Sequence, residues 1–278
     1  MLQKYLYFLI FFMICQPSFV NSAELCHIAN AGFYVSDGSS SVLFDALFAD
    51  GLEGYATATK QLEEKLENAE EPFDNVKMIV VTHFHDDHMK PAPIIKHLSS
   101  NPKAVGLMTE QAYNILKDDN LSENNDHRIM HITPFIGTQH SYIDLPFPTT
   151  VFGISHGEKN PTENIGVMIE IDGQSIMHVG DIDAKLEDLL KAGTNLAKID
   201  WLLIPYWALT DEEGINLVKT AFNARHIVPM HFNTDENNWI KEHGGMTAIK
   251  NKIYESLPNM VKLDKEMQCI NINGKNVP

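Results

Sequence analysis

Hydrophobic positions along the chain follow strand-like and helix-like spacings in turn. The run Val76–Val81 is almost wholly apolar and rich in β-branched residues, which is typical of a buried strand. Residues Tyr55–Ala69 place Leu62 and Leu66 on one face and glutamates on another, which predicts an amphipathic helix. By the same criteria we expect further strands at Cys26–Val35, Ser41–Phe48, Ile165–Ile171, Gln174–His178, Trp201–Pro205, Ile227–Met230, Val261–Leu263 and Gln268–Ile272, and further helices at Ala92–Leu98, Thr109–Lys117, Ala184–Ala192, Asp211–Asn223 and Met246–Ser256.

Both halves of the chain contain a strand hairpin followed by alternating strands and helices. Turn-forming residues at Ser36–Ser39 and at Asp172-Gly173 separate apolar runs and predict the two hairpins. No repeat, low-complexity tract or linker interrupts the sequence, which favours one continuous domain. We therefore expect an α/β (α+β) fold in which two β-sheets pack face to face with helices outside.

The N-terminal segment does not fit this domain pattern. Lys4 precedes an apolar stretch, Tyr5–Cys15. This stretch is too short to span a membrane, which requires about 20 residues. Small residues follow, ending at Ala23. This order predicts a signal peptide over residues 1–23 and a mature domain over residues 24–278, although an uncleaved anchor or a buried helix would have a similar composition. We expect a periplasmic or secreted protein with no stable membrane span after cleavage.

The formal net charge is −16, with 21% charged and 44% hydrophobic residues. A chain this acidic repels phosphate backbones and anionic lipids, so nucleic acid is an unexpected partner and a small-molecule substrate is expected. An anionic substrate is still compatible, because bound metal ions reverse the charge locally. The sequence gives no indication of an oligomeric state.

Two cysteines, Cys26 and Cys269, remain after the signal peptide is removed. A disulfide between them would persist in an oxidising compartment and would close a very long loop. Two buried free thiols are the alternative, because the sequence does not give the distance between the two Cα atoms. Neither cysteine lies near the metal-ligand motifs.

A dense group of potential metal ligands follows the apolar run that ends at Val81. His83, His85, Asp87 and His88 supply three imidazoles and a carboxylate within six residues. His83 and His85 would point to one side of an extended segment, and a turn after them would direct Asp87 and His88 towards a second ion. Imidazole and carboxylate together suit zinc, manganese or iron.

Three further candidates lie just after apolar strand-like runs. They are His156, Asp181 and His231. Catalytic groups are commonly placed on loops at the carboxyl ends of strands, so these residues would complete the ligand set. A polar loop with coincidental histidines, or an adventitious metal site, is the alternative for the first group alone.

This pattern resembles the metallo-β-lactamase-fold hydrolases. Their signature is His-x-His-x-Asp-His after a strand, followed by a histidine, a Gly-Asp pair and a late histidine. The resemblance implies an αβ/βα sandwich with two metal ions, usually zinc and sometimes iron or manganese. It assigns His83, His85 and His156 to metal one. It assigns Asp87, His88 and His231 to metal two, with Asp181 bridging both and Asp45 bracing the site.

The resemblance also implies a hydrolytic mechanism. A water that bridges two ions becomes a hydroxide nucleophile near neutral pH and attacks an ester, lactone or phosphodiester. Asp87 could orient this hydroxide and carry its proton, or it could serve only as a ligand. The alternatives are a periplasmic β-lactamase that opens an amide ring, and a metal-binding member without catalytic activity.

The residue type at position 181 helps to indicate which branch of the family the chain resembles. The most familiar β-lactamase subclass has a cysteine there, whereas an aspartate is typical of lactonase, thioesterase and phosphodiesterase branches. The surrounding residues look most like the ascorbate-phosphate lactonase-like and phospholipase-like branch. Quorum lactonases place a tyrosine where this chain has Ala184, which weakens a direct transfer of that activity.

Overall fold

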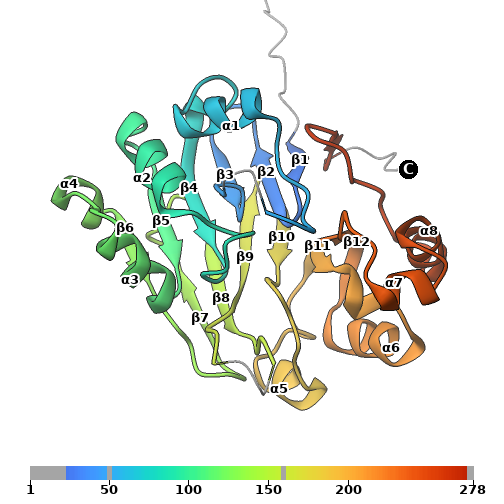
Figure 1. Cartoon of the computed structure of the whole chain (residues 1–278). Helices are drawn as coiled ribbons and strands as arrows, with labels where there is room; N and C mark the ends of the chain where they lie inside the picture. The colour runs from blue at the N-terminus through green and yellow to red at the C-terminus, as the bar shows by residue number, and fades with distance from the viewer. Residues whose placement is uncertain (1–22, 49–51, 158–160, 274–278) are drawn as a thin grey trace, which may run out of the picture.

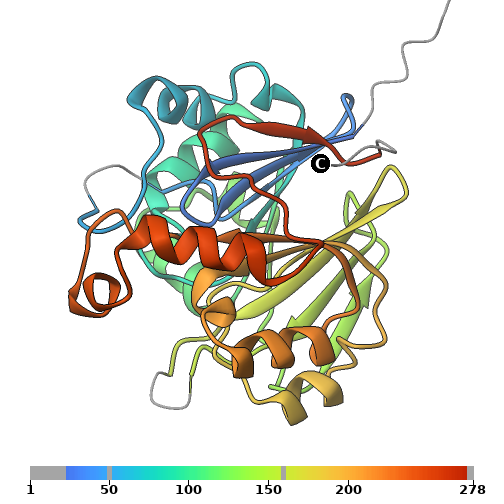
Figure 2. The ribbon, with the colours of Figure 1, turned by 90° about the vertical axis from the view of Figure 1, so that its right-hand side faces the viewer.

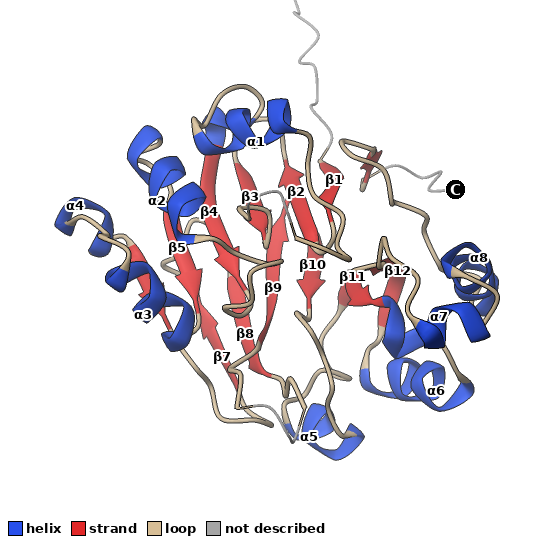
Figure 3. Cartoon of the chain, in the orientation of Figure 1, coloured by secondary structure: helices blue, strands red, loops and turns tan. Residues whose placement is uncertain are grey.

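A computed structural model describes residues 23–48, 52–157 and 161–273. Two β-sheets lie face to face, and helices lie on the outer face of each (Figures 1 and 3). Nearly all of the predicted signal peptide, residues 1–22, lies outside the described residues. Within the described ranges, none of the helices combines the length and hydrophobicity needed to cross a bilayer.

The first sheet has seven strands in the order β13-β1-β2-β3-β4-β5-β6, and the second has six in the order β12-β11-β10-β9-β8-β7. Strands β3 to β6 are parallel neighbours, as are β10 to β12. The strands of the first sheet are β1 (Glu24–Ala29), β2 (Gly32–Ser36), β3 (Ser41–Phe44), β4 (Val76–Val81), β5 (Val105–Met108), β6 (Ile129–His131) and β13 (Cys269–Asn271). Those of the second are β7 (Gln139–Tyr142), β8 (Thr149–Gly153), β9 (Ile165–Ile171), β10 (Gln174–His178), β11 (Ile199–Pro205) and β12 (Ala224–Met230).

The helices fall into two groups that follow the two halves of the chain. Figure 2 shows them in separate parts of the molecule, with the cyan helix α1 above and the orange and red helices below. The first group comprises α1 (Lys60–Glu67), the 3-10 turn η1 (Phe73–Asn75), α2 (Pro91–Ser100), α3 (Glu110–Asp118) and α4 (Glu123–Asp126). The second comprises α5 (Leu186–Lys191), η2 (Tyr206–Leu209), α6 (Glu212–Ala221), α7 (Asn238–Glu242) and α8 (Met246–Ser256).

Three layers of buried side chains hold the sheets and helices together. In β4, Met78 and Val80 enter the core between the sheets, while Ile79 and Val81 pack under the helices of the first group. This alternation explains why the strand is apolar at almost every position, since both of its faces are buried. The second sheet repeats the arrangement, with Trp201 facing the inner core. The four-layer αβ/βα sandwich expected from the sequence is confirmed.

Some predicted element boundaries were wrong. The run Cys26–Val35 forms two strands, β1 and β2, because the chain reverses at Asn30, which has a φ of 49°. The helix predicted at Tyr55–Ala69 contains only Lys60–Glu67, so Tyr55 lies on the preceding loop. The residues Val261–Leu263 form no strand, although their apolar side chains are buried in the core. The segment pairs with β12 only through an isolated bridge, in which Val261 N–H donates to the Ile227 carbonyl at 2.8 Å, and the pairing does not continue into a strand.

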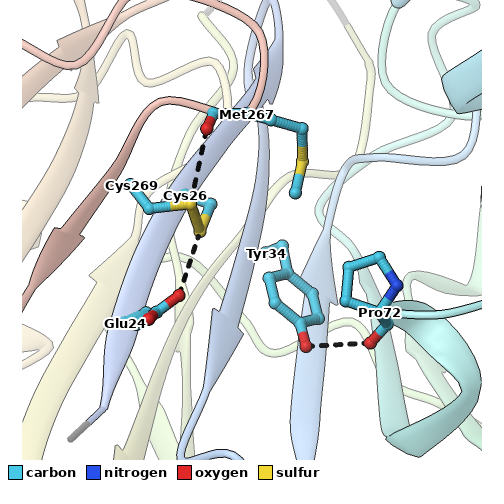
Figure 4. The surroundings of a disulfide bond; sticks show 6 residues. All are labelled: Glu24, Cys26, Tyr34, Pro72, Met267 and Cys269. Atoms are coloured by element: carbon cyan, nitrogen blue, oxygen red, sulfur yellow. Dashed lines mark hydrogen bonds between the residues drawn. A yellow bond between two sulfur atoms is a disulfide. The ribbon is translucent and has the colours of Figure 1, made fainter.

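Cys26 and Cys269 form a disulfide, so the bridge is the correct one of the two alternatives (Figure 4). The two cysteines are register partners where β13 pairs with β1. The bridge thus joins positions 243 residues apart in the sequence. Beside it, the Tyr34 hydroxyl donates a hydrogen bond to the Pro72 carbonyl at 3.0 Å. The end of the chain is therefore attached covalently to the edge of the first sheet.

Candidate metal centre

All seven predicted ligand residues meet in one place between the two sheets. His83, His85, Asp87 and His88 lie on the loop after β4 in the first sheet. The others come from the second sheet, on the segments that follow β8, β10 and β12: His156, Asp181 and His231, respectively. Carboxyl ends of parallel strands meet at one edge, which is why residues so distant in sequence can converge.

One cluster consists of His83, His85, His156 and Asp181, whose potential ligand atoms all lie within 4.8 Å of one another. Nε2 of His83 is 3.1 Å from Nδ1 of His85. Nε2 of both His83 and His156 lies 3.8 Å from Oδ2 of Asp181. Three imidazoles thus surround one carboxylate oxygen.

A second cluster consists of Asp87, His88 and His231. Nε2 of His231 is 2.9 Å from Oδ2 of Asp87 and 3.1 Å from Nε2 of His88. Asp181 reaches this cluster as well, since its Oδ1 is 3.2 Å from Nε2 of His88. Its Oδ2, which lies near His83 and His156, is also 3.5 Å from Nε2 of His231, so Asp181 lies between the two clusters and approaches both.

The chemistry of these groups fits two metal ions. Nitrogen atoms of neighbouring imidazoles approach to 3.1 Å, a distance at which two lone pairs repel unless a proton or a metal ion lies between them. Among the described residues, Nε2 of His156 and Oδ1 of Asp181 are buried without a hydrogen-bond partner, which is costly for polar atoms. Nitrogen and carboxylate oxygen donors together suit zinc, manganese or iron.

A buried hydrogen-bond network anchored on Asp45 orients two of the histidines. The Asp45 carboxylate accepts from Thr82 Oγ1 at 2.5 Å and from His88 Nδ1 at 2.7 Å. Because the single Thr82 hydroxyl proton goes to Asp45, Thr82 Oγ1 accepts from His83 Nδ1 at 3.1 Å. Both imidazoles thus have a proton on Nδ1 and direct Nε2 to the clusters.

Two asparagine side chains bond to the two ligand aspartates, one at a carboxylate and the other at a backbone N–H. Asn30 Nδ2 donates to Asp87 Oδ2 at 3.1 Å, and Asn164 Oδ1 accepts from the backbone N–H of Asp181 at 3.1 Å. Asn164 also approaches Gly180, where an added Cβ would lie only 2.0 Å from its Oδ1. Gly180 has a φ of +61°, so glycine is required there both by the backbone and by this close approach.

Burial and neighbouring charges shift the pKa values of the site residues. Burial opposes ionisation of Asp181, but the imidazoles of His88 and His231 hold the pKa of that carboxyl well below its usual range. Burial, reinforced by His88, lowers the pKa of His83 well below 6.5. An ionised carboxylate beside a neutral imidazole is the protonation state that metal binding requires.

The two sides of the centre differ. A cavity of about 980 Å³ opens beside His156 and Asn164. On the other side, aromatic rings surround His231, with the Trp207 ring 4.8 Å and the Tyr55 ring 5.5 Å from its imidazole. Burial raises the pKa of Tyr55, and the carboxylates of Asp87 and Asp181 raise it further.

Several residues near the metal centre were not predicted from the sequence to belong to it. Asn30 fell inside a predicted strand, and Tyr55 inside a predicted helix. A glycine at position 54, just before Tyr55, was the one signal against that helix. His178 is buried and bonds to the Ala31 carbonyl at 2.9 Å. Tyr206 is buried and stacks on Phe232.

Comparison with known proteins agrees with this geometry. A family model described as "Beta-lactamase superfamily domain" matches residues 40–247. A UPF0173 metal-dependent hydrolase of Pyrococcus furiosus is 24% identical over 214 residues, covering 76% of this chain and 85% of the relative. The residues matched by the family model include all seven histidines and aspartates of the two clusters.

Solved structures show the same fold at low sequence identity. A metallohydrolase from Ignicoccus hospitalis has a TM-score of 0.60 and 18% identity, with 90% of this chain and 97% of that chain covered. A metallo-β-lactamase fold protein from Bacillus subtilis has a TM-score of 0.57 and 11% identity, with 89% and 99% covered. At these identities the likeness establishes the architecture alone.

Proposed function

The chain belongs to the β-lactamase superfamily and is a metal-dependent hydrolase, and on this basis we propose that it is an exported two-metal enzyme that cleaves an ester, lactone or phosphodiester. The convergence of His and Asp side chains from both sheets is the observation that carries the proposal. His83, His85 and His156 would hold one ion, and Asp87, His88 and His231 the other. Asp181, whose carboxylate approaches histidines of both clusters, would bridge them.

The metals would act together with groups of the chain. When bound, a pair of zinc, manganese or iron ions polarises a carbonyl or phosphoryl oxygen and makes water a better nucleophile at neutral pH. Asp87 would orient the attacking water and accept its proton. Its carboxylate is suited to this role because Asn30 and His231 both contact Oδ2, which fixes the plane of the group.

The surroundings of the centre favour a small substrate. The cavity of about 980 Å³ beside His156 has room for a metabolite-sized molecule. A net charge of −16 disfavours a nucleic acid. An aspartate at position 181, and the residues around it, support the lactonase- and phospholipase-like branch over the subclass of β-lactamases with a cysteine ligand.

The proposal that the enzyme is exported to the periplasm or outside the cell has two supports. Residues 1–23 have the composition of a signal peptide. The Cys26–Cys269 disulfide suits an oxidising compartment, since cytosolic thiols are generally kept reduced.

A substrate panel tests this function. Protein lacking residues 1–23 would be loaded with zinc, manganese or iron(II) and assayed with p-nitrophenyl acetate, a thiolactone, bis(p-nitrophenyl) phosphate and nitrocefin. We expect metal-dependent turnover of an ester, lactone or phosphodiester that a chelator abolishes and added metal restores.

Two outcomes would contradict the proposal. Turnover of nitrocefin alone would assign the enzyme to amide-ring opening. Protein with two bound metal equivalents but no turnover of any probe would instead indicate a metal-binding protein without this catalytic activity.

A further inference from the structure

Tyr55 lies beside the second cluster of the metal centre, at His231. Its ring packs edge-on against the His231 imidazole, with 5.5 Å between ring centroids. It also interacts electrostatically with the carboxylates of Asp87 and Asp181. The side chain is half-buried, and among the described residues its phenol has no hydrogen-bond partner. A phenol O–H beside the reacting centre is thus available to a bound molecule.

The loop that carries Tyr55 is hydrogen-bonded to the segment that follows His231. The Gly54 carbonyl accepts a hydrogen bond from the Thr234 N–H at 3.0 Å. Gly54 has a φ of +87°, and an added Cβ would lie 2.9 Å from Oδ1 of Asp235. The position before Tyr55 therefore requires glycine, and the phenol and His231 are positioned by the same pair of loops.

A cavity beside the first cluster has room for a substrate. The cavity there is lined by His156 and Asn164, together with Ile154, Thr162 and Glu163. His156 belongs both to the cavity lining and to the first cluster, and Asp181 joins that cluster to His231, the residue that Tyr55 contacts. Hydrolysis of an ester or phosphodiester places negative charge on a substrate oxygen in the transition state.

We propose that Tyr55 is a catalytic residue, whose phenol O–H donates a hydrogen bond to the substrate oxygen that gains negative charge beside His231. This inference rests on the proposed hydrolytic function of the centre. The phenol keeps its proton throughout, so no further acid, base or co-reactant is needed. Ala184 lies three residues after Asp181, and its methyl side chain offers no hydrogen-bond donor. Tyr55 would supply such a donor from the loop before α1.

The test compares Tyr55→Phe with Tyr142→Phe in zinc-loaded protein. Tyr142 is a half-buried tyrosine on the edge strand β7, so its variant controls for loss of a phenol group. For phenyl acetate and p-nitrophenyl acetate, Tyr55→Phe should lower kcat about 10- to 100-fold, with little change in KM, because a hydrogen bond to a charged oxygen is lost. A larger loss for phenyl acetate would identify the leaving oxygen as acceptor, and equal losses would identify the carbonyl oxygen.

A second measurement does not depend on turnover. Isothermal titration calorimetry with inorganic phosphate should show about tenfold weaker binding to zinc-loaded Tyr55→Phe than to wild type, at unchanged zinc content. If wild type hydrolyses neither ester, the proposed activity on esters fails, but the phosphate comparison still decides the role of Tyr55. Kinetics and phosphate binding that match those of Tyr142→Phe would overturn the inference.

Discussion

The carboxylate of Asp45 accepts a hydrogen bond from Nδ1 of His88 at 2.7 Å, and both side chains are completely buried. His88 is one of the proposed metal ligands, whereas Asp45 holds it from behind. A buried carboxylate in this position fixes the ring orientation and increases the basicity of the opposite nitrogen. The contact therefore connects the loop after β3 with metal binding at the loop after β4.

Removing the Asp45 carboxylate should weaken metal binding while leaving every proposed ligand in place. We expect Asp45→Ala to lower zinc affinity about 10- to 100-fold, as is typical when the partner of a ligating histidine is lost. Competition with a chromogenic chelator would measure the affinity. Asp118→Ala, at the exposed end of α3, is the control. Equal affinities of the two variants would contradict a bracing role for Asp45.

Asp181 should decide how many ions bind, because its oxygens face both clusters. Elemental analysis should find close to two metal equivalents in wild type and at most about one in Asp181→Ala. Asp183→Ala changes an exposed carboxylate two residues away and should retain both ions. A wild-type ratio well below one after zinc loading would rule out the two-metal centre.

Gly180 should be intolerant of a side chain for two separate reasons, its positive φ and its contact with Asn164. Gly173 in the β9–β10 turn shares the first, with a φ of +74°, but an added Cβ there has no neighbour within 4 Å. Gly180→Ala should therefore reduce the free energy of unfolding by at least about 1 kcal/mol more than Gly173→Ala. Urea denaturation of both variants would measure this, and equal losses would show that Asn164 moves aside freely.

His97 should make the protein less stable in acid. It is buried under α1, where Nδ1 donates to the Leu66 carbonyl at 2.5 Å and Nε2 has no hydrogen-bond partner in the described part of the chain. Burial lowers its pKa below 6.5 in the folded state. Below pH 6.5 this histidine is protonated in the unfolded chain but not yet in the folded chain. The free energy of unfolding therefore falls as the pH decreases.

The matched comparison for this effect is His97→Gln. Between about pH 7.5 and about pH 5.5, wild type should lose more free energy of unfolding than the variant, because only wild type carries this histidine. The comparison cancels the contributions of the metal-site histidines, which both proteins share. Parallel stability curves for the two proteins would contradict the assignment.

The sequence predicted the ligand residues better than the groups that position them. His83 to His88, His156, Asp181 and His231 each follow an apolar strand, and that local pattern is visible without a structure. Asn30 and Asn164 were not identified as site residues, because an asparagine has no distinctive spacing and its role depends on contacts across sheets. Their contribution arises from tertiary packing.

Tyr55 and the disulfide also depend on contacts between distant parts of the chain. Hydrophobic periodicity predicted a helix over Tyr55, although the chain there forms a loop that is hydrogen-bonded to a segment about 180 residues later. The cysteines could be paired only once β13 was known to lie against β1. Hydrophobic spacing reports which face of an element is buried, but it does not report which distant element covers that face.

The origin of the proposed ligands in both sheets has a consequence for the assembly of the molecule. The loop after β4 belongs to the first sheet, whereas the segments after β8, β10 and β12 belong to the second. Neither sheet by itself presents a complete coordination sphere. Each ion would consequently act as a noncovalent cross-link between the halves, and the free energy of metal binding would be added to their association. Chelation would then promote separation of the two halves, in addition to abolishing turnover.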